Sequence, residues 1–136
     1  MKVYFNELSP LPTHIEPNNI DKPENTFPLR VYVCEHCWLV QTDDFVQAET
    51  LFSPSYAYFS STSTSWLSHA ELFVEKIIER QHLDENSFVI EIASNDGYLL
   101  KNFVQAQIPC LGIEPTKATA EASRALNIPV LERFFS

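Results

Sequence analysis

Residues 88–136 alternate short apolar segments with helical stretches, and this alternation constrains the fold more than any other feature of the sequence. The segment FVIEIA is typical of a parallel strand that is covered on both faces, and IPCLGIE is predicted to be a second strand. The predicted helices are residues 98–106 and 117–126, and PVLE, residues 129–132, begins a third strand. The order β-α-β-α-β predicts right-handed crossovers and a parallel sheet.

Composition narrows the class of protein. A chain of 136 residues has the usual size of one domain, and 45% hydrophobic residues are too many for a disordered chain. The formal net charge of −9 argues against nucleic acid as a partner, since affinity for a phosphate backbone depends mostly on cationic groups. No apolar run is long enough to cross a bilayer, and the first residues lack the pattern of a secretory signal. A cytoplasmic protein without a membrane partner is therefore expected.

The first third of the chain is dense in proline and carries a cysteine pair. Four prolines among residues 1–27 predict an extended arm that forms neither helices nor a strand ladder. The segment LRVYVCEHCWLVQT then predicts two short strands joined in a hairpin at the CEHC sequence. In a reducing compartment Cys34 and Cys37 can be free thiols, a redox pair or half of a metal site. Cys110, in a short apolar run, is expected to be a buried small hydrophobic residue.

The middle of the chain connects this hairpin to the predicted sheet. Residues 48–64 are rich in aromatic and hydroxyl side chains without clean periodicity, which predicts a packed loop with one helical turn. Residues 65–81 carry apolar side chains at helical spacing, and this pattern places Trp66, Phe73 and Ile77 in the core. The domain boundaries expected from these patterns are 1–47, 48–86 and 87–136.

Two polar features are expected to meet at the carboxyl edge of the predicted sheet. The turn Asn95-Asp96-Gly97 follows the first strand, and Glu114 ends the second. In an open parallel sheet, ligands bind beyond the carboxyl ends of the strands. An acidic residue at the position of Glu114 can accept both hydroxyls of a ribose. The two features together predict a nucleoside pocket, although the turn is a poor match to a G-x-G-x-x-G dinucleotide fingerprint.

These residues also resemble a known family. VIEIASNDGYLL followed by LGIEP resembles the first and second nucleotide-binding motifs of S-adenosylmethionine-dependent C-methyltransferases that act on nucleotide-linked deoxysugars. Upstream, YAYFSSTSTSWLSHA extends the resemblance, and FPLRVYVCEHCWLVQ is similar to the family's N-terminal zinc-binding module. The resemblance covers about residues 27–135, and its three motifs occur in the family's order and spacing.

The resemblance implies roles for individual residues. Glu114 would hold the ribose of the cofactor, while the aromatic segment Tyr58, Phe59 and Ser60 would close over the cofactor or the sugar. The loop around the methionine portion would consist of Glu91, Ala93, Ser94, Asn95, Asp96 and Gly97. This loop is chemically suitable because a glycine permits left-handed backbone geometry and a carboxylate can pair with a cationic group.

The resemblance also implies a zinc site, of which this sequence carries only part. A structural zinc ion takes four Cys or His ligands. The family has another Cys pair before the proline-rich arm, so Cys34 and Cys37 would form an incomplete site here. The other candidate ligands are His14, His36, His69 and His82, of which His14 is preferred as a third ligand.

The expected fold class is therefore α/β: a partial Rossmann-like parallel sheet, preceded by a small zinc-ribbon-like hairpin and an amphipathic helix. The expected function is S-adenosylmethionine-dependent C-methylation of a nucleotide-linked keto-deoxysugar. The family's catalytic base lies beyond the motifs matched here, so we expect a fragment that is inactive alone or is completed by a second chain. One alternative is a non-catalytic zinc-hairpin binding or interaction module. Another is a dehydrogenase fragment, which the scarcity of glycine in the first turn disfavours.

Overall fold

The computed structural model describes residues 2–10, 15, 17–52, 56 and 58–135. The chain divides into two compact units, residues 1–53 and 54–136, and each is described by itself. The domain boundaries expected at residues 47 and 86 stay a prediction.

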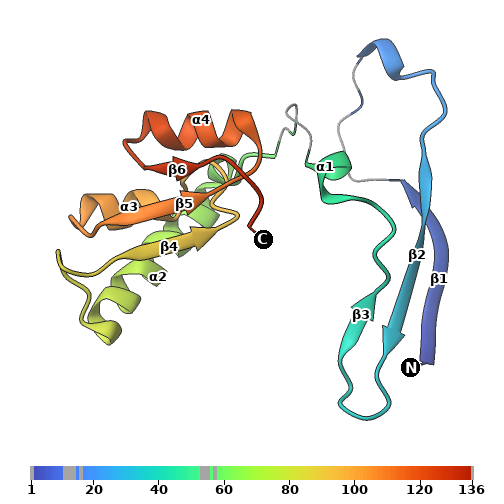
Figure 1. Cartoon of the computed structure of the whole chain (residues 1–136), viewed down its shortest axis with the longest axis horizontal. Helices are drawn as coiled ribbons and strands as arrows, with labels where there is room; N and C mark the ends of the chain where they lie inside the picture. Colours follow the sequence, from blue (N-terminus) through green and yellow to red (C-terminus); the bar gives the residue numbers. More distant parts are fainter. Residues whose placement is uncertain (1, 11–14, 16, 53–55, 57, 136) are drawn as a thin grey trace. The chain divides into compact units, whose positions relative to one another are not determined.

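The first unit is a three-stranded antiparallel sheet in the order β1-β2-β3 (Figure 1). Its strands are β1 (Lys2–Pro10), β2 (Thr26–Val33) and β3 (Val40–Thr42). The strands β2 and β3 form the predicted hairpin, in which Val33 pairs with Val40 and Val31 with Thr42. A short 3-10 helix, η1 (Pro17–Asn19), and one helical turn, α1 (Ala48–Leu51), complete the unit.

The prediction of an arm without a strand ladder is wrong for residues 2–10. Strand β1 pairs antiparallel with β2 along its length, from Lys2 opposite Val33 to Pro10 opposite Thr26. The reason is local: residues 2–9 contain no proline, so each of them keeps the backbone N–H that ladder pairing uses, and only Pro28 of β2 lacks one. Prolines interrupt the chain only from Pro10 onward, which is where the strand ends.

The second unit contains the predicted β-α-β-α-β order. Helix α2 (Thr64–Gln81) leads into β4 (Val89–Ile92), α3 (Leu100–Gln105), β5 (Cys110–Ile113), α4 (Lys117–Ala125) and β6 (Val130–Leu131). A 3-10 helix, η2 (Ser60–Thr62), precedes α2. The three strands are parallel in the order β4-β5-β6, which confirms the predicted parallel sheet. Helix α2 begins with a side-chain cap, because the Ser63 hydroxyl accepts a hydrogen bond from the Trp66 N–H.

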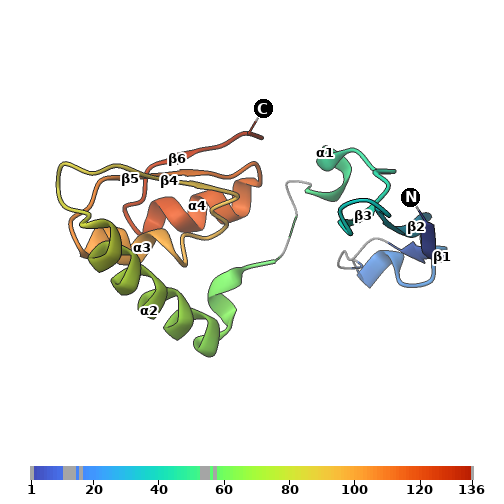
Figure 2. The same cartoon turned by 90° about the horizontal axis from the view of Figure 1, so that it is seen from below.

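The core lies on one face of this sheet. Figure 2 shows α2, α3 and α4 on the same side of the strands. The buried residues between them are Val74, Leu100, Phe103, Ile108, Cys110 and Ile128. The burial of Cys110 confirms the prediction of a small buried hydrophobic residue.

The expectation that β4 is covered on both faces is wrong for this chain. Ile90 and Ile92 point away from the helices and are 55% and 53% exposed. The strand order proceeds in one direction from β4 to β6, and successive crossovers of one hand in one direction place their helices on one face. The apolar run in β4 therefore predicts a strand correctly, but the described residues cover only one of its faces.

The prediction that the apolar face of α2 lies in the core is also partly wrong. Trp66 and Phe73 are nearly half exposed, and Ile77 is partly buried, whereas Ala70 and Val74 are buried. Helix α2 contacts the rest of the unit mainly through α3 and η2, so only a narrow stripe of its apolar side is covered.

Among the described residues, no helix combines the length and apolar character needed to span a membrane. The cytoplasmic location stays a prediction.

Candidate functional site

The bend that follows β4 is built from residues with left-handed backbone geometry. Ala93, Asn95 and Gly97 have φ values of 60°, 51° and 80°. The N–H groups of Ala93 and Ser94 both donate to the carbonyl oxygen of Ile113, at 2.8 and 3.2 Å. These bonds fix the bend against the end of β5. The left-handed geometry expected of Gly97 is present, while that of Ala93 has no signal in the sequence.

Glu114 lies against this bend and is buried, with 5% of its surface exposed. Its Oε2 accepts a hydrogen bond from the Asn95 N–H at 2.9 Å, across a separation of 19 residues. Its Oε1 accepts from the Thr116 N–H at 2.9 Å and from the Thr116 hydroxyl. A carboxylate has about four acceptor positions, so about one, on Oε2, is left for a further donor. The two polar features predicted to meet at this edge are therefore in direct contact.

The side chains of the bend hold the segment that precedes α2. Asn95 Oδ1 accepts from the Ser60 N–H at 2.9 Å, and its Nδ2 donates to the Tyr58 carbonyl at 3.0 Å. Asp96 Oδ2 accepts from the Ser61 N–H at 3.0 Å. These bonds bring the aromatic segment to the bend. The Tyr58 side chain itself is mainly exposed, and Phe59 and Ser60 are half-buried.

Acidic groups are concentrated under the bend. Burial, and after it the negative charges of Asp96 and Glu114, raises the pKa of the Glu91 carboxyl to about 8. Glu91 is therefore mostly protonated at neutral pH. Within the described part of the chain, the buried oxygens Glu91 Oε2, Asp96 Oδ1 and Ser94 Oγ have no hydrogen-bond partner. A buried oxygen without a donor is costly, so Asp96 Oδ1 and Ser94 Oγ need a donor that no described residue is seen to supply.

Ser94 belongs to the packing beneath the bend. Its side chain is fully buried against Gly112 of β5, where a Cβ would collide with the Ser94 hydroxyl. The small residue predicted for a ligand loop is thus also needed for the contact between the bend and β5.

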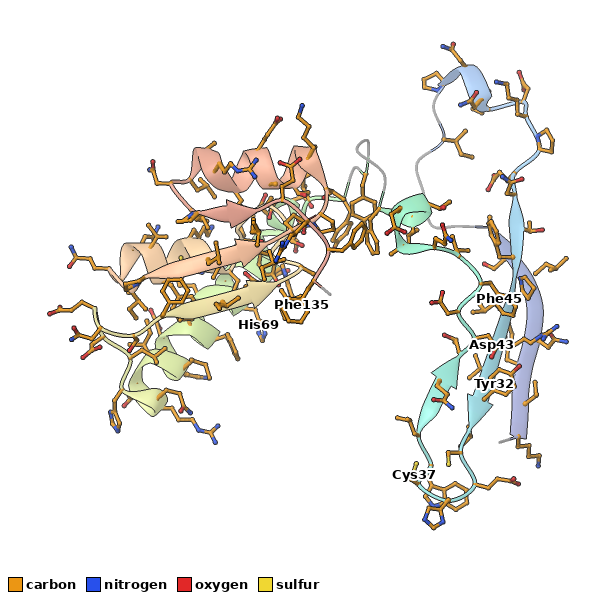
Figure 3. All side chains as sticks on the ribbon, viewed as in Figure 1. Tyr32, Cys37, Asp43, Phe45, His69 and Phe135 are labelled. Carbon is orange, nitrogen blue, oxygen red and sulfur yellow. The ribbon has the colours of Figure 1, made fainter. Side chains whose placement is uncertain are left out.

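An apolar hollow of about 170 Å³ lies beside the acidic cluster. It is lined by Trp66, His69, Ala70, Phe73, Tyr98 and Leu99. The Trp66 and His69 rings stack with centroids 5.2 Å apart, and Trp66 lies 5.9 Å from the Tyr98 ring. Burial, and after it the charge of Glu91, raises the pKa of the Tyr98 phenol. Tyr98 therefore connects the hollow to the acidic cluster, and Figure 3 shows His69 among the side chains of this unit.

The cysteine pair occupies the turn of the β2–β3 hairpin, where Figure 3 shows Cys37 at the free end. The Trp38 N–H donates to the Cys34 carbonyl and the Cys34 N–H to the Leu39 carbonyl, both at 2.9 Å. Hydrogen bonds from the backbone N–H groups of Cys37 and His36, together with a side-chain hydrogen bond to Cys37, lower the pKa of the Cys34 thiol. The two cysteines are free of disulfide bonds.

This donor set fits part of a zinc site. Thiolates are zinc ligands, and N–H groups directed at sulfur stabilise the thiolate form. A structural site needs four ligands, however, and no group of three potential ligands occurs in the described parts of the chain. His14, the preferred third ligand, lies outside the described residues. His36 is exposed in the same turn, and His69 and His82 belong to the second unit.

Sequence reasoning missed the residues that support the site. Thr116 and Thr119 are fully buried, their hydroxyls contact each other, and Thr116 bonds Glu114. The signal that could have found Thr116 is its position two residues after the acidic residue, where a hydroxyl and N–H can reach back to a carboxylate. Ser61 and Tyr98 carried no comparable signal, since their contacts join segments far apart in the sequence.

The fold and the site define an α/β protein with an acidic cluster at the carboxyl edge of a parallel sheet and a cysteine hairpin in a separate unit. Residues 5–52 match a family described as "Putative zinc binding domain". The chain is also 30% identical over 113 residues to the C-methyltransferase NovU of Streptomyces niveus, a match that covers 83% of this chain and 27% of that protein. The chain thus spans about a quarter of this curated relative's length. Both matches agree with the resemblance to sugar C-methyltransferases that the sequence motifs indicate.

Proposed function

We propose that residues 54–136 recognise S-adenosylmethionine through a partial Rossmann-like sheet. The observation that carries this proposal is the contact between Asn95 N–H and Glu114 Oε2, which joins the bend after β4 to the acidic end of β5. Ligands bind at this edge of parallel sheets. Near this contact, Asp96 Oδ1 and Ser94 Oγ are buried without a donor among the described residues. S-adenosylmethionine carries hydrogen-bond donors and positive charge, which such oxygens attract.

In this proposal, different residues bind different parts of the cofactor. Glu114 Oε2 has about one acceptor position left, which suits one ribose hydroxyl instead of two. The loop from Glu91 to Gly97 surrounds the methionine portion, where Asp96 Oδ1 is an acceptor for the ammonium group. The segment Tyr58, Phe59 and Ser60 lies over the bend and excludes water. The cofactor, when bound, supplies an electrophilic methyl group.

The whole protein's activity is a further part of the proposal. We propose methyl transfer to a carbon of a nucleotide-linked keto-deoxysugar, because the motifs of this chain resemble those of sugar C-methyltransferases and the matched relative is a C-methyltransferase. Such a reaction needs a base to remove a proton beside the keto group. We propose that the base and the sugar-binding residues belong to a further segment or second chain, which would also cover Ile90 and Ile92.

Calorimetric titration of the chain with S-adenosylmethionine and with its demethylated product tests cofactor recognition. We expect binding of both, weakened about tenfold or more by Glu114→Gln, which removes a charged acceptor. Glu121→Gln is the matched control, because Glu121 is exposed on α4 and pairs with Lys117 at the surface. Absence of heat at millimolar ligand with folded protein, or equal affinity in the two variants, would contradict the proposal.

Proton release gives a second test. A cationic ligand near Glu91 stabilises its carboxylate form, so binding lowers the pKa of Glu91 from about 8 and releases a proton near neutral pH. Titrations in buffers of different ionisation enthalpy measure this release. We expect it for the wild-type chain and expect none for Glu91→Gln.

A second candidate function has its own support. The match of residues 5–52 to a zinc-binding family, with the thiols of Cys34 and Cys37 in one turn, favours a zinc-binding interaction module in the first unit. Metal analysis separates the candidates: zinc that is lost in Cys34→Ser supports the module. Zinc-free protein that binds the cofactor supports the methyltransferase unit alone.

A further inference from the structure

We propose that Thr116 and Thr119 are positioning residues for Glu114, and that they restrict this carboxylate to one of the two ribose hydroxyls of the ligand. This role rests on the proposed function, because it concerns the same cofactor site. It gives the two threonines a part in ligand selectivity in addition to their part in packing.

The hydrogen bonds at Glu114 Oε1 occupy the positions that a ligand would need there. A carboxylate oxygen has about two acceptor positions. At Oε1 both are taken, by the Thr116 N–H at 2.9 Å and by the Thr116 hydroxyl. Glu114 and Thr116 are both buried, so solvent does not compete for these bonds. A ligand hydroxyl that donates to Glu114 must therefore do so at Oε2.

Thr119 fixes the direction in which the Thr116 hydroxyl donates. A carboxylate only accepts, so the single hydroxyl proton of Thr116 belongs to the bond with Glu114. The Thr119 hydroxyl contacts the Thr116 hydroxyl and donates to the Thr116 carbonyl oxygen at 3.0 Å. Thr119 is therefore the donor in the contact between the hydroxyls, and it shares its proton between two acceptors. The protons point from Thr119 to Thr116 and on to Glu114, and such a chain strengthens its members.

The position of Thr116 at the start of α4 shows that its hydroxyl does not serve the helix. Thr116 is the N-cap residue of α4 and has extended backbone geometry, with φ −87° and ψ 127°. A threonine at this position usually accepts a hydrogen bond from an N–H of the first helical turn. Among the described residues of α4, no N–H donates to the Thr116 hydroxyl, which is directed to Glu114 instead. The hydroxyl therefore acts on the carboxylate.

Glu114 Oε2 keeps about one acceptor position, and its direction is fixed. The Asn95 N–H occupies the other position on Oε2 at 2.9 Å. Glu114 is thus held from the bend through Oε2 and from the start of α4 through Oε1, so it cannot turn to meet both hydroxyls of a ribose. An acceptor that is ordered before the ligand arrives favours binding, because it loses no freedom on association. We therefore expect only one ribose hydroxyl to contribute to affinity through Glu114.

Ligands that lack one hydroxyl test this selectivity in the unaltered chain. The probes are the demethylated product of S-adenosylmethionine and its 2′-deoxy and 3′-deoxy analogues, titrated calorimetrically. We expect one analogue to bind about tenfold or more weakly than the parent compound, and the other to bind within about twofold of it. Equal affinity of the two analogues would refute the single-hydroxyl selectivity while cofactor recognition stands. Absence of binding of the parent compound would refute the proposed function and this inference with it.

Substitutions of Thr116 test its positioning role. Thr116→Val keeps the shape and the N–H but removes the hydroxyl donor, so Oε1 gains an open position and the preference between the analogues should fall below about threefold. Thr116→Ser restores the hydroxyl and should restore the preference. A purely structural role would weaken all three ligands alike and keep the preference, which would overturn the inference. Thr42→Val, at an exposed position of β3 in the first unit, is the matched control.

Thr119→Val gives a second measurement, which decides the positioning role if Thr116→Val does not fold. It leaves the Thr116 hydroxyl in place but removes the donor that orients it. We expect the preference between the analogues to fall by about threefold. Circular dichroism checks the fold of every variant, and an unchanged preference in folded Thr119→Val would refute the role of this residue.

Discussion

Glu91 shows how the surroundings of one residue change its chemistry. In an exposed strand, a glutamate carries a negative charge at neutral pH. Here burial comes first and two neighbouring carboxylates second, and together they raise its pKa to about 8. The sequence placed Glu91 at the site, but its protonation depends on Asp96 and Glu114, which reach it only in the folded chain.

The raised pKa predicts how stability depends on pH. Folded Glu91 keeps a proton that the unfolded chain releases above about pH 4.5, so the folded state binds more protons between about pH 4.5 and 8. The free energy of unfolding therefore falls as pH rises through this range, by at most about 1.4 kcal/mol per pH unit from this group. Urea unfolding at pH 5, 6.5 and 8 measures the slope.

Two variants isolate the contribution of Glu91 to that slope. Glu91→Gln should flatten the pH dependence and be more stable than the wild type at pH 8. Glu121→Gln, at an exposed position of α4, should follow the wild-type curve. Parallel curves for Glu91→Gln and the wild type would show that Glu91 titrates normally.

A second prediction for a single residue concerns Gly97. Its φ is 80°, and a Cβ built on it would lie 2.5 Å from Ile128 Cδ1 and 2.7 Å from Ser123 Oγ. Gly97→Ala therefore combines a left-handed backbone penalty with overpacking and should lower the free energy of unfolding by about 2 to 4 kcal/mol. Ala93→Gly is the contrasting variant: it relieves a left-handed alanine and should not destabilise the chain. Chemical denaturation measures both, and an unchanged midpoint for Gly97→Ala would contradict the packing argument.

At the scale of elements, periodicity in the sequence found the helices and parallel strands to within about two residues. It succeeded at α2, whose apolar spacing is regular, and at β4 and β5, which are bounded by turns. It failed at β1, because the proline density of residues 10–23 was applied to residues 2–9, which contain no proline. It also could not find the bonds from Asn95 and Asp96 to residues 58–61, since side-chain contacts across about 35 residues leave no periodic pattern.

Because one face of β4 is exposed, we expect substitutions on the two sides of the sheet to change the free energy of unfolding by different amounts. Ile92 is 53% exposed on the uncovered face, so Ile92→Thr should change the free energy of unfolding by less than about 1 kcal/mol. Leu100 is fully buried under the other face, and Leu100→Ala should cost about 3 kcal/mol. Thermal and urea unfolding of both variants measures this difference. A large loss for Ile92→Thr would mean that a second copy or another segment already covers this face in solution.

For the whole molecule, the two units should respond to different ligands. The thiols of the proposed zinc site lie in residues 1–53, and the acidic cluster lies in residues 54–136. A ligand slows amide exchange where it stabilises hydrogen-bonded structure, so each ligand should protect its own unit. Zinc should slow exchange in β2, β3 and the turn between them. S-adenosylmethionine should slow exchange at residues 58–61, 93–97 and 114–116.

Hydrogen–deuterium exchange of the intact chain, read by mass spectrometry, measures both patterns in one sample. Cys34→Ser should remove the zinc response and keep the cofactor response, and Glu114→Gln should do the reverse. Because no fragment has to fold alone, a lost response cannot be attributed to truncation. If Cys34→Ser also removed the cofactor response, the zinc hairpin would have to stabilise the acidic site, and the independence of the two proposals would fail.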